Sequence, residues 1–222
     1  GVRCTKLVTM AANPAGTYGT SATGATQGQL RLLRASAHSA LYVHTAGRSA
    51  TLDLAMAGGM GSKAHSADPM YSCIASPIIA LAAALWDRWI PRAWIARTLL
   101  GACERLQGSA RPRSLVNGPC AAAVASCGSI GATFVPEELA IRFVGGSEVK
   151  LLELCPMSVK HVVHMAIEDW ALERARERHE YMGTLAHKPY LAPLQRLVNS
   201  KPTADWTPKH QGMLKAIVAN GL

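Results

Sequence analysis

Acidic residues are missing from the first 52 positions of this 222-residue chain, and the first acid is Asp53. Residues 1–113 hold twelve lysines and arginines against four acids, whereas residues 114–222 hold eleven against ten. The net charge of +9 is therefore concentrated in the N-terminal half of the chain. Such an asymmetry favours contact with a polyanion, either a nucleic acid or an anionic membrane surface.

Aromatic residues and long apolar runs are also scarce. Five of the few aromatic residues are tryptophans, and the longest apolar run, residues 74–86, ends at Asp87 and Arg88. That run is too short for a bilayer-spanning helix, which needs about 20 residues. We therefore expect no membrane span, and no signal peptide is predicted. The core must be built from small aliphatic side chains, which bury little area each, at about 25 cal/mol per Å². This is a modest indication of self-assembly.

Paired cysteine motifs are absent as well. The spacing of the six cysteines is irregular and no CxxC pair exists. Several of the cysteines lie in apolar surroundings, so free buried thiols in a reducing, intracellular compartment are predicted rather than disulfides.

The glycine-rich segment before residue 65 lacks the features of a phosphate-binding loop. Its pattern, Gly59-x-Gly61-x-x-Ala64, fits a loose dinucleotide fingerprint, but a loop-like segment follows where a helix would have to begin. A Walker A loop needs Gly directly before Lys63 and Ser or Thr directly after it, and Ser62 and Ala64 stand there instead. We predict no nucleotide cofactor.

Metal and thiol chemistry are left as minor alternatives. Cys155, His161 and His164 could share a metal ion, but a closed structural zinc site needs four ligands, and no fourth is evident. Cys120 and Cys127 could be nucleophiles, yet no histidine lies near them in sequence. We therefore predict neither a metal site nor a catalytic residue, and a small metal- or thiol-dependent enzyme is the third alternative.

The pattern of the chain predicts an α+β fold that is predominantly helical, with two β-hairpins and a flexible N-terminal arm. The arm, residues 1–29, is rich in Ala, Gly, Thr and Ser and has few large side chains to bury. Hairpins are predicted at about residues 40–57 and 138–154, the second around Gly145 and Gly146. The arm, residues 30–113 and residues 114–222 form three predicted regions, with a boundary at 110–114; one continuous domain is the alternative.

Four helices are predicted from their end signals. They begin at Ser76-Pro77, at Pro91, at Ser158 and after Thr207-Pro208, and the second ends before Gly108. Residues 120–132 fit either a small-residue helix or a loop. The helix after Ser158 should run to Gly183, and its second half is almost wholly charged. We expect that half to leave its own core and reach into solvent or toward a partner.

The basic half contains the candidate binding residues. Trp86, Trp89 and Trp94 lie among the arginines between Arg88 and Arg113; we interpret them as the core of a helical pair, and base stacking is the alternative. Phosphate contact is predicted for nine residues: Arg31, Arg34, Arg48, Lys63, Arg88, Arg92, Arg97, Arg111 and Arg113. No RNA-recognition or zinc-finger motif is present, so binding should be sequence-tolerant and strongly salt-dependent.

These patterns predict a non-enzymatic structural protein that self-assembles and binds a nucleic-acid backbone, RNA rather than DNA, as a coat or nucleocapsid subunit of a virion does. In composition the chain resembles RNA-coating proteins of some fungal RNA viruses, a likeness that rests on no motif and implies no site. The alternative is an accessory subunit of a large organellar complex, such as a mitochondrial ribosome or a respiratory assembly. In that case the acid-free N-terminal region would reflect import and processing.

Overall fold

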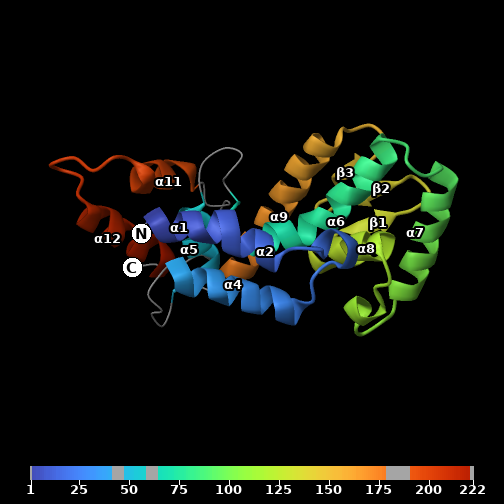
Figure 1. Cartoon of the computed structure of the whole chain (residues 1–222), viewed down its shortest axis with the longest axis horizontal. Helices are drawn as coiled ribbons and strands as arrows, with labels where there is room; N and C mark the ends of the chain where they lie inside the picture. The colour runs from blue at the N-terminus through green and yellow to red at the C-terminus, as the bar shows by residue number, and fades with distance from the viewer. Residues whose placement is uncertain (1, 42–47, 59–64, 179–190, 221–222) are drawn as a thin grey trace. The chain divides into compact units, whose positions relative to one another are not determined.

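The computed structural model describes residues 2–41, 48–58, 65–178 and 191–220, which form helices and one small antiparallel sheet (Figure 1). The predicted predominantly helical α+β class is confirmed. The helical elements are α1 Val2–Leu7, π-helix η1 Val8–Ala12, α2 Asn13–Gly16, α3 Thr20–Thr23, α4 Gln27–Leu41, α5 Ala50–Ala57, α6 Pro69–Trp86, α7 Arg92–Leu106, 3-10 helix η3 Pro112–Leu115, α8 Pro119–Ser129, α9 Pro156–Arg178, α11 Ala192–Asn199 and α12 Pro208–Asn220. The strands are β1 Thr133–Val135, β2 Ala140–Arg142 and β3 Glu148–Lys150.

The chain forms two compact units that are interleaved along the sequence. Unit 1 combines Gly1–Gly16, Arg31–Pro69 and Ala171–Leu222, and unit 2 combines Thr17–Leu30 and Met70–Trp170. The segment 110–114, which the sequence suggests as a boundary, lies inside unit 2.

The sheet belongs to unit 2 and has the strand order β1-β2-β3, with both pairs antiparallel. Phe134, Ile141 and Val149 face one another across the three strands, and all three are buried. This row forms the inner face of the sheet. Arg142 pairs with Glu148 across strands β2 and β3, at 2.8 Å between Nη2 and Oε2, with both side chains partly exposed.

The β2–β3 pair occupies the position of the second predicted hairpin, residues 138–154. Gly145 and Gly146 have φ values of 98° and 85°, as a tight turn with two left-handed residues requires. The amide of Phe143 donates to the carbonyl of Ser147 at 2.8 Å and closes this turn. The partner strand β1 was not predicted from the sequence.

The first predicted hairpin, at residues 40–57, is wrong wherever the structure describes it. Residues 40–41 end helix α4 and residues 50–57 form helix α5, while 42–47 lie outside the described residues. The alternation of Leu52, Asp53 and Leu54 suggests a half-buried strand, yet all three side chains are buried. Asp53 lies inside because its charge is paired, so the polar residue of the pattern does not mark an outer face.

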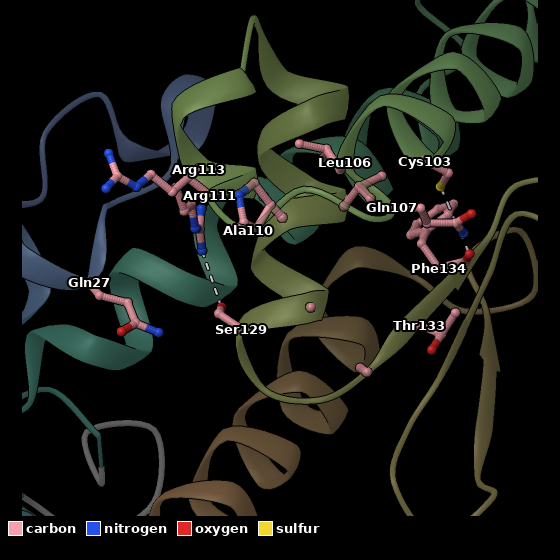
Figure 2. A pocket seen from close by; sticks show the side chains of 15 residues that line it. Gln27, Cys103, Leu106, Gln107, Ala110, Arg111, Arg113, Ser129, Thr133 and Phe134 are labelled. Atoms are coloured by element: carbon pink, nitrogen blue, oxygen red, sulfur yellow. Dashed lines mark hydrogen bonds between the residues drawn. The ribbon is translucent and has the colours of Figure 1, made fainter.

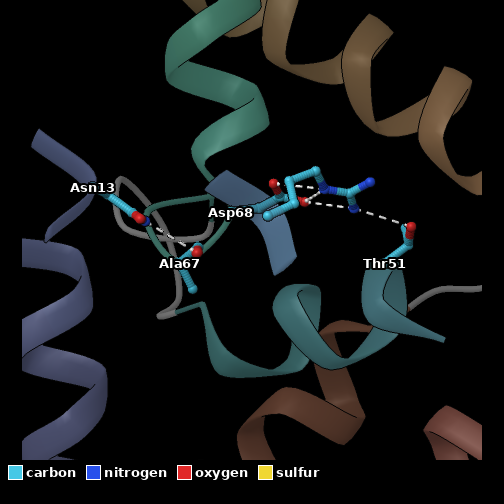
Figure 3. Close-up of polar contacts among 5 residues, drawn as sticks. Asn13, Thr51, Ala67 and Asp68 are labelled. Carbon is cyan, nitrogen blue, oxygen red and sulfur yellow. Dashed lines mark hydrogen bonds and ion pairs between the residues drawn. The ribbon is translucent and has the colours of Figure 1, made fainter. Parts of the chain in front are cut away.

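Helices replace the predicted flexible arm. Val8 is buried and packs in a cluster with Ala37 and Leu54. The buried side-chain amide of Asn13 donates to the carbonyl of Ser66 at 2.9 Å and to that of Ala67 at 3.1 Å; Figure 3 shows the bond to Ala67. The small residues of this segment therefore become ordered by packing on other parts of the protein, not by a large apolar face of their own.

Helix α6 begins eight residues before its predicted start. Asp68-Pro69 supplies the same polar-residue–proline start as Ser76-Pro77, and the structure uses the earlier one, leaving Pro77 inside the helix. By length and composition alone α6 could cross a membrane, but 61% of its 18-residue window is buried inside the protein. A core helix passes the same test, so this is weak evidence for a membrane span.

Two other helices lie close to their predicted positions, and a third resolves an open alternative. Helix α7 starts directly after Pro91 and ends before Gly108, whose φ is 79°. Helix α12 begins at Pro208, as predicted. Residues 120–132 fit either a helix or a loop by sequence. Helix α8, Pro119–Ser129, covers 120–129 of this range, and its four alanines are buried: Ala121, Ala122, Ala123 and Ala125.

The second half of α9 does not simply reach into solvent. Leu172 and Ala175 are buried in a cluster with Leu52 and Leu191 in unit 1. The charged residues around them hide this apolar pair in the sequence, which is why the pattern suggests an all-polar segment. Residues 179–183, the predicted end of the helix, lie outside the described residues.

Candidate nucleic-acid interface

The corner between helices α6 and α7 exposes three tryptophans. Trp86 is 50% exposed, Trp89 78% and Trp94 68%. The prediction that these side chains form the core of the helical pair is therefore wrong. Smaller side chains fill that role: Leu85 on α6, and Ile95 and Leu99 on the inner face of α7, are buried.

Three arginines lie among these tryptophans. Arg88, Arg92 and Arg97 are all exposed, and none has a hydrogen bond or ion pair with another part of the chain that the structure describes. Trp94 and Arg97 are three residues apart on α7, so their side chains are neighbours on the outer face of the helix. We name the exposed residues Trp86, Arg88, Trp89, Arg92, Trp94 and Arg97 the Trp–Arg corner.

Arg88 holds a backbone conformation that ordinary residues avoid. Its φ is +55°, in the left-handed region, and it lies after the last turn of α6. The amide of Trp89 donates to the carbonyl of Ala84 at 3.3 Å, the bond typical of a helix end that turns through a left-handed residue. Glycine usually fills this position, so an exposed arginine here keeps its charge at a conformational cost.

Two of the predicted phosphate-binding arginines, Arg34 and Arg48, form ion pairs with buried aspartates of unit 1. Arg34 donates from Nε and Nη2 to both oxygens of Asp68, at 2.8 Å for Nη2 to Oδ2, and from Nη2 to Thr51 Oγ1 at 3.1 Å (Figure 3). Arg48 donates from Nε and Nη2 to the carboxylate of Asp53. Both arginines therefore have a structural role within the fold.

Asp53 is the centre of a buried charge cluster. It is 1% exposed, and its Oδ2 lies 2.7 Å from Nε2 of His38 and 2.9 Å from Nε of Arg48. The charge of Asp53 also acts on Lys215 of α12. Burial lowers the pKa of the Lys215 ammonium group, and the negative charge of Asp53 raises it in part. The hydrogen bonds of Asp53 join helix α5 to helix α4 and to Arg48 within unit 1.

The remaining predicted arginines are separated from this cluster. Arg31 is exposed on helix α4, and Arg111 is exposed beside η3. Arg113 is half-buried and donates from Nη2 to Ser129 Oγ at 3.2 Å. Lys63 lies outside the described residues, as does the glycine-rich segment around it. Of the nine predicted residues, the structure thus gathers Arg88, Arg92 and Arg97 at one corner and Arg111 with Arg113 at a second place in unit 2.

The three potential metal ligands do not form a site in the described structure. His161 is exposed, and His164 packs edge-on against Tyr71, with 5.4 Å between the ring centroids. Within residues 2–41, 48–58, 65–178 and 191–220, no group of three or more His, Cys, Asp or Glu side chains could hold a metal ion.

The cysteines divide into two chemical classes. Burial raises the pKa of the Cys103 and Cys120 thiols, and raises that of Cys127 to about 12. The hydrogen bonds from Ser158 lower the pKa of Cys155 at the start of α9. All six cysteines are free thiols; Cys73, Cys103 and Cys127 are buried as expected, whereas Cys4 is exposed.

The fold and this interface give no family assignment. A scan against protein-family models, a search of curated proteins and a search of solved structures each found no match for this chain. The functional argument therefore rests on the residues of the chain and their geometry.

Proposed function

We propose that this protein is a non-enzymatic structural protein that binds the nucleic-acid backbone without sequence specificity and self-assembles, as a coat or nucleocapsid subunit does. The observation that carries the proposal is the Trp–Arg corner. Large aromatic side chains are normally buried, and here three of the five tryptophans of the chain are exposed beside three unpaired arginines.

This arrangement suits a single-stranded nucleic acid. Bases of any sequence stack on aromatic side chains, at about 1–3 kcal/mol per base, and guanidinium groups contact the phosphates between them. Because neither contact depends on base identity, binding would follow the strand and not its sequence. We propose RNA as the ligand, because sequence-tolerant stacking on aromatic side chains is common in proteins that bind single-stranded RNA.

Assembly is the second half of the proposal. Leu7, Met10 and Leu32 are 66%, 78% and 71% exposed in unit 1. Single exposed apolar residues are ordinary, but large ones on helices suit contact with further protein subunits. The same side chains would also suit unlike chains, as in an accessory subunit of a ribosome or a respiratory assembly, which is the second candidate function.

The test measures binding of a single-stranded oligoribonucleotide to the full chain across a salt series. Trp89→Ala combined with Trp94→Ala should weaken binding by about 30-fold or more, because two stacking contacts of about 1–3 kcal/mol each are lost. Tyr18→Ala is the matched control, since Tyr18 is an exposed aromatic side chain, at 92%, that is not part of the corner. Equal affinity of the double variant and the control would overturn the proposed interface.

Assembly is tested by light scattering and the 260/280 nm absorbance ratio of native particles at low and high salt. Large particles rich in nucleic acid that release it at high salt support the coat-like function. A small species free of nucleic acid at every salt concentration contradicts it. Copurification with a fixed set of unlike chains would then favour the accessory subunit.

A further inference from the structure

A pocket of about 560 Å³ lies within unit 2, between α7, η3, α8 and β1 (Figure 2). Its volume falls in the range of about 300–1,000 Å³ that is typical of small-molecule sites. One side carries Arg111, Arg113 and Ser129, and the other carries Cys103 and Phe134. No aspartate or glutamate is among its lining residues.

The guanidinium group of Arg113, which is one of the lining residues, is incompletely bonded. Nη2 donates to Ser126 Oγ and Ser129 Oγ, at 3.4 Å and 3.2 Å. Nη1 is buried and has no hydrogen-bond partner in the described parts of the chain. It lies against Gly24, where even a Cβ atom would come within 2.2 Å of it.

The charge of Arg113 is also uncompensated. Burial lowers the pKa of its guanidinium group, and the groups that oppose this effect are two thiols, Cys127 and Cys73, with no carboxylate among them. A thiol whose pKa lies at about 12, as for Cys127, carries no negative charge at neutral pH. In unit 1, by contrast, the partly buried Arg34 and Arg48 each have a carboxylate. Among the described residues, Arg113 thus differs from these two partly buried arginines.

An incompletely paired, half-buried cation beside a pocket is costly unless something neutralises it. We propose that this pocket binds a phosphate ester, with its oxyanion on Arg113 and Arg111 and its organic part toward Leu106 and Phe134. A guanidinium fork matches the geometry of phosphate oxygens, and the apolar end suits a planar or aliphatic body. This proposal does not depend on the proposed function. The pocket could bind a free phosphate ester, and it could equally bind one nucleotide within a strand.

The test uses thermal stabilisation and calorimetric titration of the full chain with AMP and, separately, with an oligoribonucleotide that has no terminal phosphate. AMP represents a free ester, and the oligonucleotide represents phosphodiesters in a strand. Arg113→Gln should weaken binding of the effective probe by about 10- to 100-fold, because a charge-assisted contact is lost. Without any probe, this variant should melt at or above the temperature of the unmodified protein, since an uncompensated buried charge has been removed.

A second variant keeps the proposal testable if Arg113→Gln does not fold. Gly128 lines the pocket on helix α8, and a Cβ atom added there meets no described atom within 4 Å. Gly128→Leu should fill the pocket and abolish binding while preserving the helix. Gly101→Leu on α7 is the matched control, because Gly101 has the same free space but does not line the pocket.

Each outcome decides the proposal. Binding of AMP that both pocket variants lose supports a site for a free ester; binding of the oligonucleotide alone, lost in the same variants, supports a seat for one nucleotide of a strand. No binding of either probe, or equal binding to all variants, overturns the proposal. A large fall in melting temperature of Arg113→Gln without probe, together with undiminished binding to Gly128→Leu, would assign Arg113 a structural role instead. A failure of the Trp–Arg corner in RNA binding leaves the AMP experiment unaffected, so the two proposals fail separately.

Discussion

Replacing Arg88 by glycine should make the protein more stable and a poorer binder of RNA at the same time. Arg88 has a φ of +55°, and a left-handed conformation costs an ordinary residue about 1–2 kcal/mol. Glycine avoids this cost but has more freedom to lose on folding, by about 0.5–1 kcal/mol. The net gain in the free energy of unfolding should therefore be about 0.5–1 kcal/mol, or a rise of about 1–4 °C in Tm for a chain of this size.

The same substitution removes one cation from the Trp–Arg corner. If Arg88 contacts a phosphate, the slope of log affinity against log salt should fall by about 0.7 for a single strand. Arg88→Ala separates the two effects, because it removes the charge but keeps a Cβ atom in the left-handed conformation. Alanine should therefore match glycine in RNA binding and fall below it in Tm.

Differential scanning calorimetry and RNA titration at several salt concentrations measure both effects. A lower Tm for Arg88→Gly would refute the argument about the helix end. A higher Tm with an unchanged affinity and salt slope would refute the assignment of Arg88 to the interface. Lys209→Gln is the charge control, since Lys209 is an exposed cation on α12 outside the corner.

Two further predictions concern the buried groups. Asp53→Ala should lower the free energy of unfolding by about 3–5 kcal/mol in urea titrations, because it leaves Arg48 and His38 without their carboxylate. The control is Glu148→Gln, in a partly exposed pair, which should cost less than about 1 kcal/mol. Equal losses in the two variants would contradict the central role of Asp53. In the native protein at neutral pH, a maleimide reagent should modify Cys155 before Cys127, because the pKa of Cys155 is lowered while that of Cys127 is about 12. Mass spectrometry measures the order of labelling, which should disappear in denaturant. Early labelling of Cys127 in the native protein would show that its surroundings open readily.

Local signals in the sequence located several elements well. The proline and glycine boundaries of α7 and the start of α12 were predicted to within a residue or two, and so was the turn at Gly145 and Gly146. Helix α4 had a signal of this kind that was missed: Thr26 and Gln29 form a capping box, with the amide of each bonded to the side chain of the other at 2.9 Å and 3.2 Å. The motif T-x-x-Q at 26–29 predicts that a helix starts at the end of the arm, where α4 begins.

Features that depend on distant contacts could not be predicted. Strand β1 has three residues and exists only through its pairing with β2. The sequence does not distinguish Asp53 from a surface carboxylate, because only the fold brings His38 and Arg48 into contact with it. The exposure of the tryptophans also follows from tertiary structure, because the buried side chains at the α6–α7 pair are the aliphatic Leu85, Ile95 and Leu99.

The internal pairing of acids has a consequence for the surface charge. Residues 1–113 contain four acids, and the two aspartates of α5 and the α6 start are used by buried pairs with Arg48 and Arg34. Between positions 87 and 113 this leaves six arginines against Asp87 and Glu104. The electrostatic potential around a protein is set by the charges that other protein charges do not neutralise. The positive potential from the net charge of +9 should therefore be strongest near this segment. The Trp–Arg corner and the Arg113 pocket both draw on the segment, which is why we expect a polyanion to be held by unit 2.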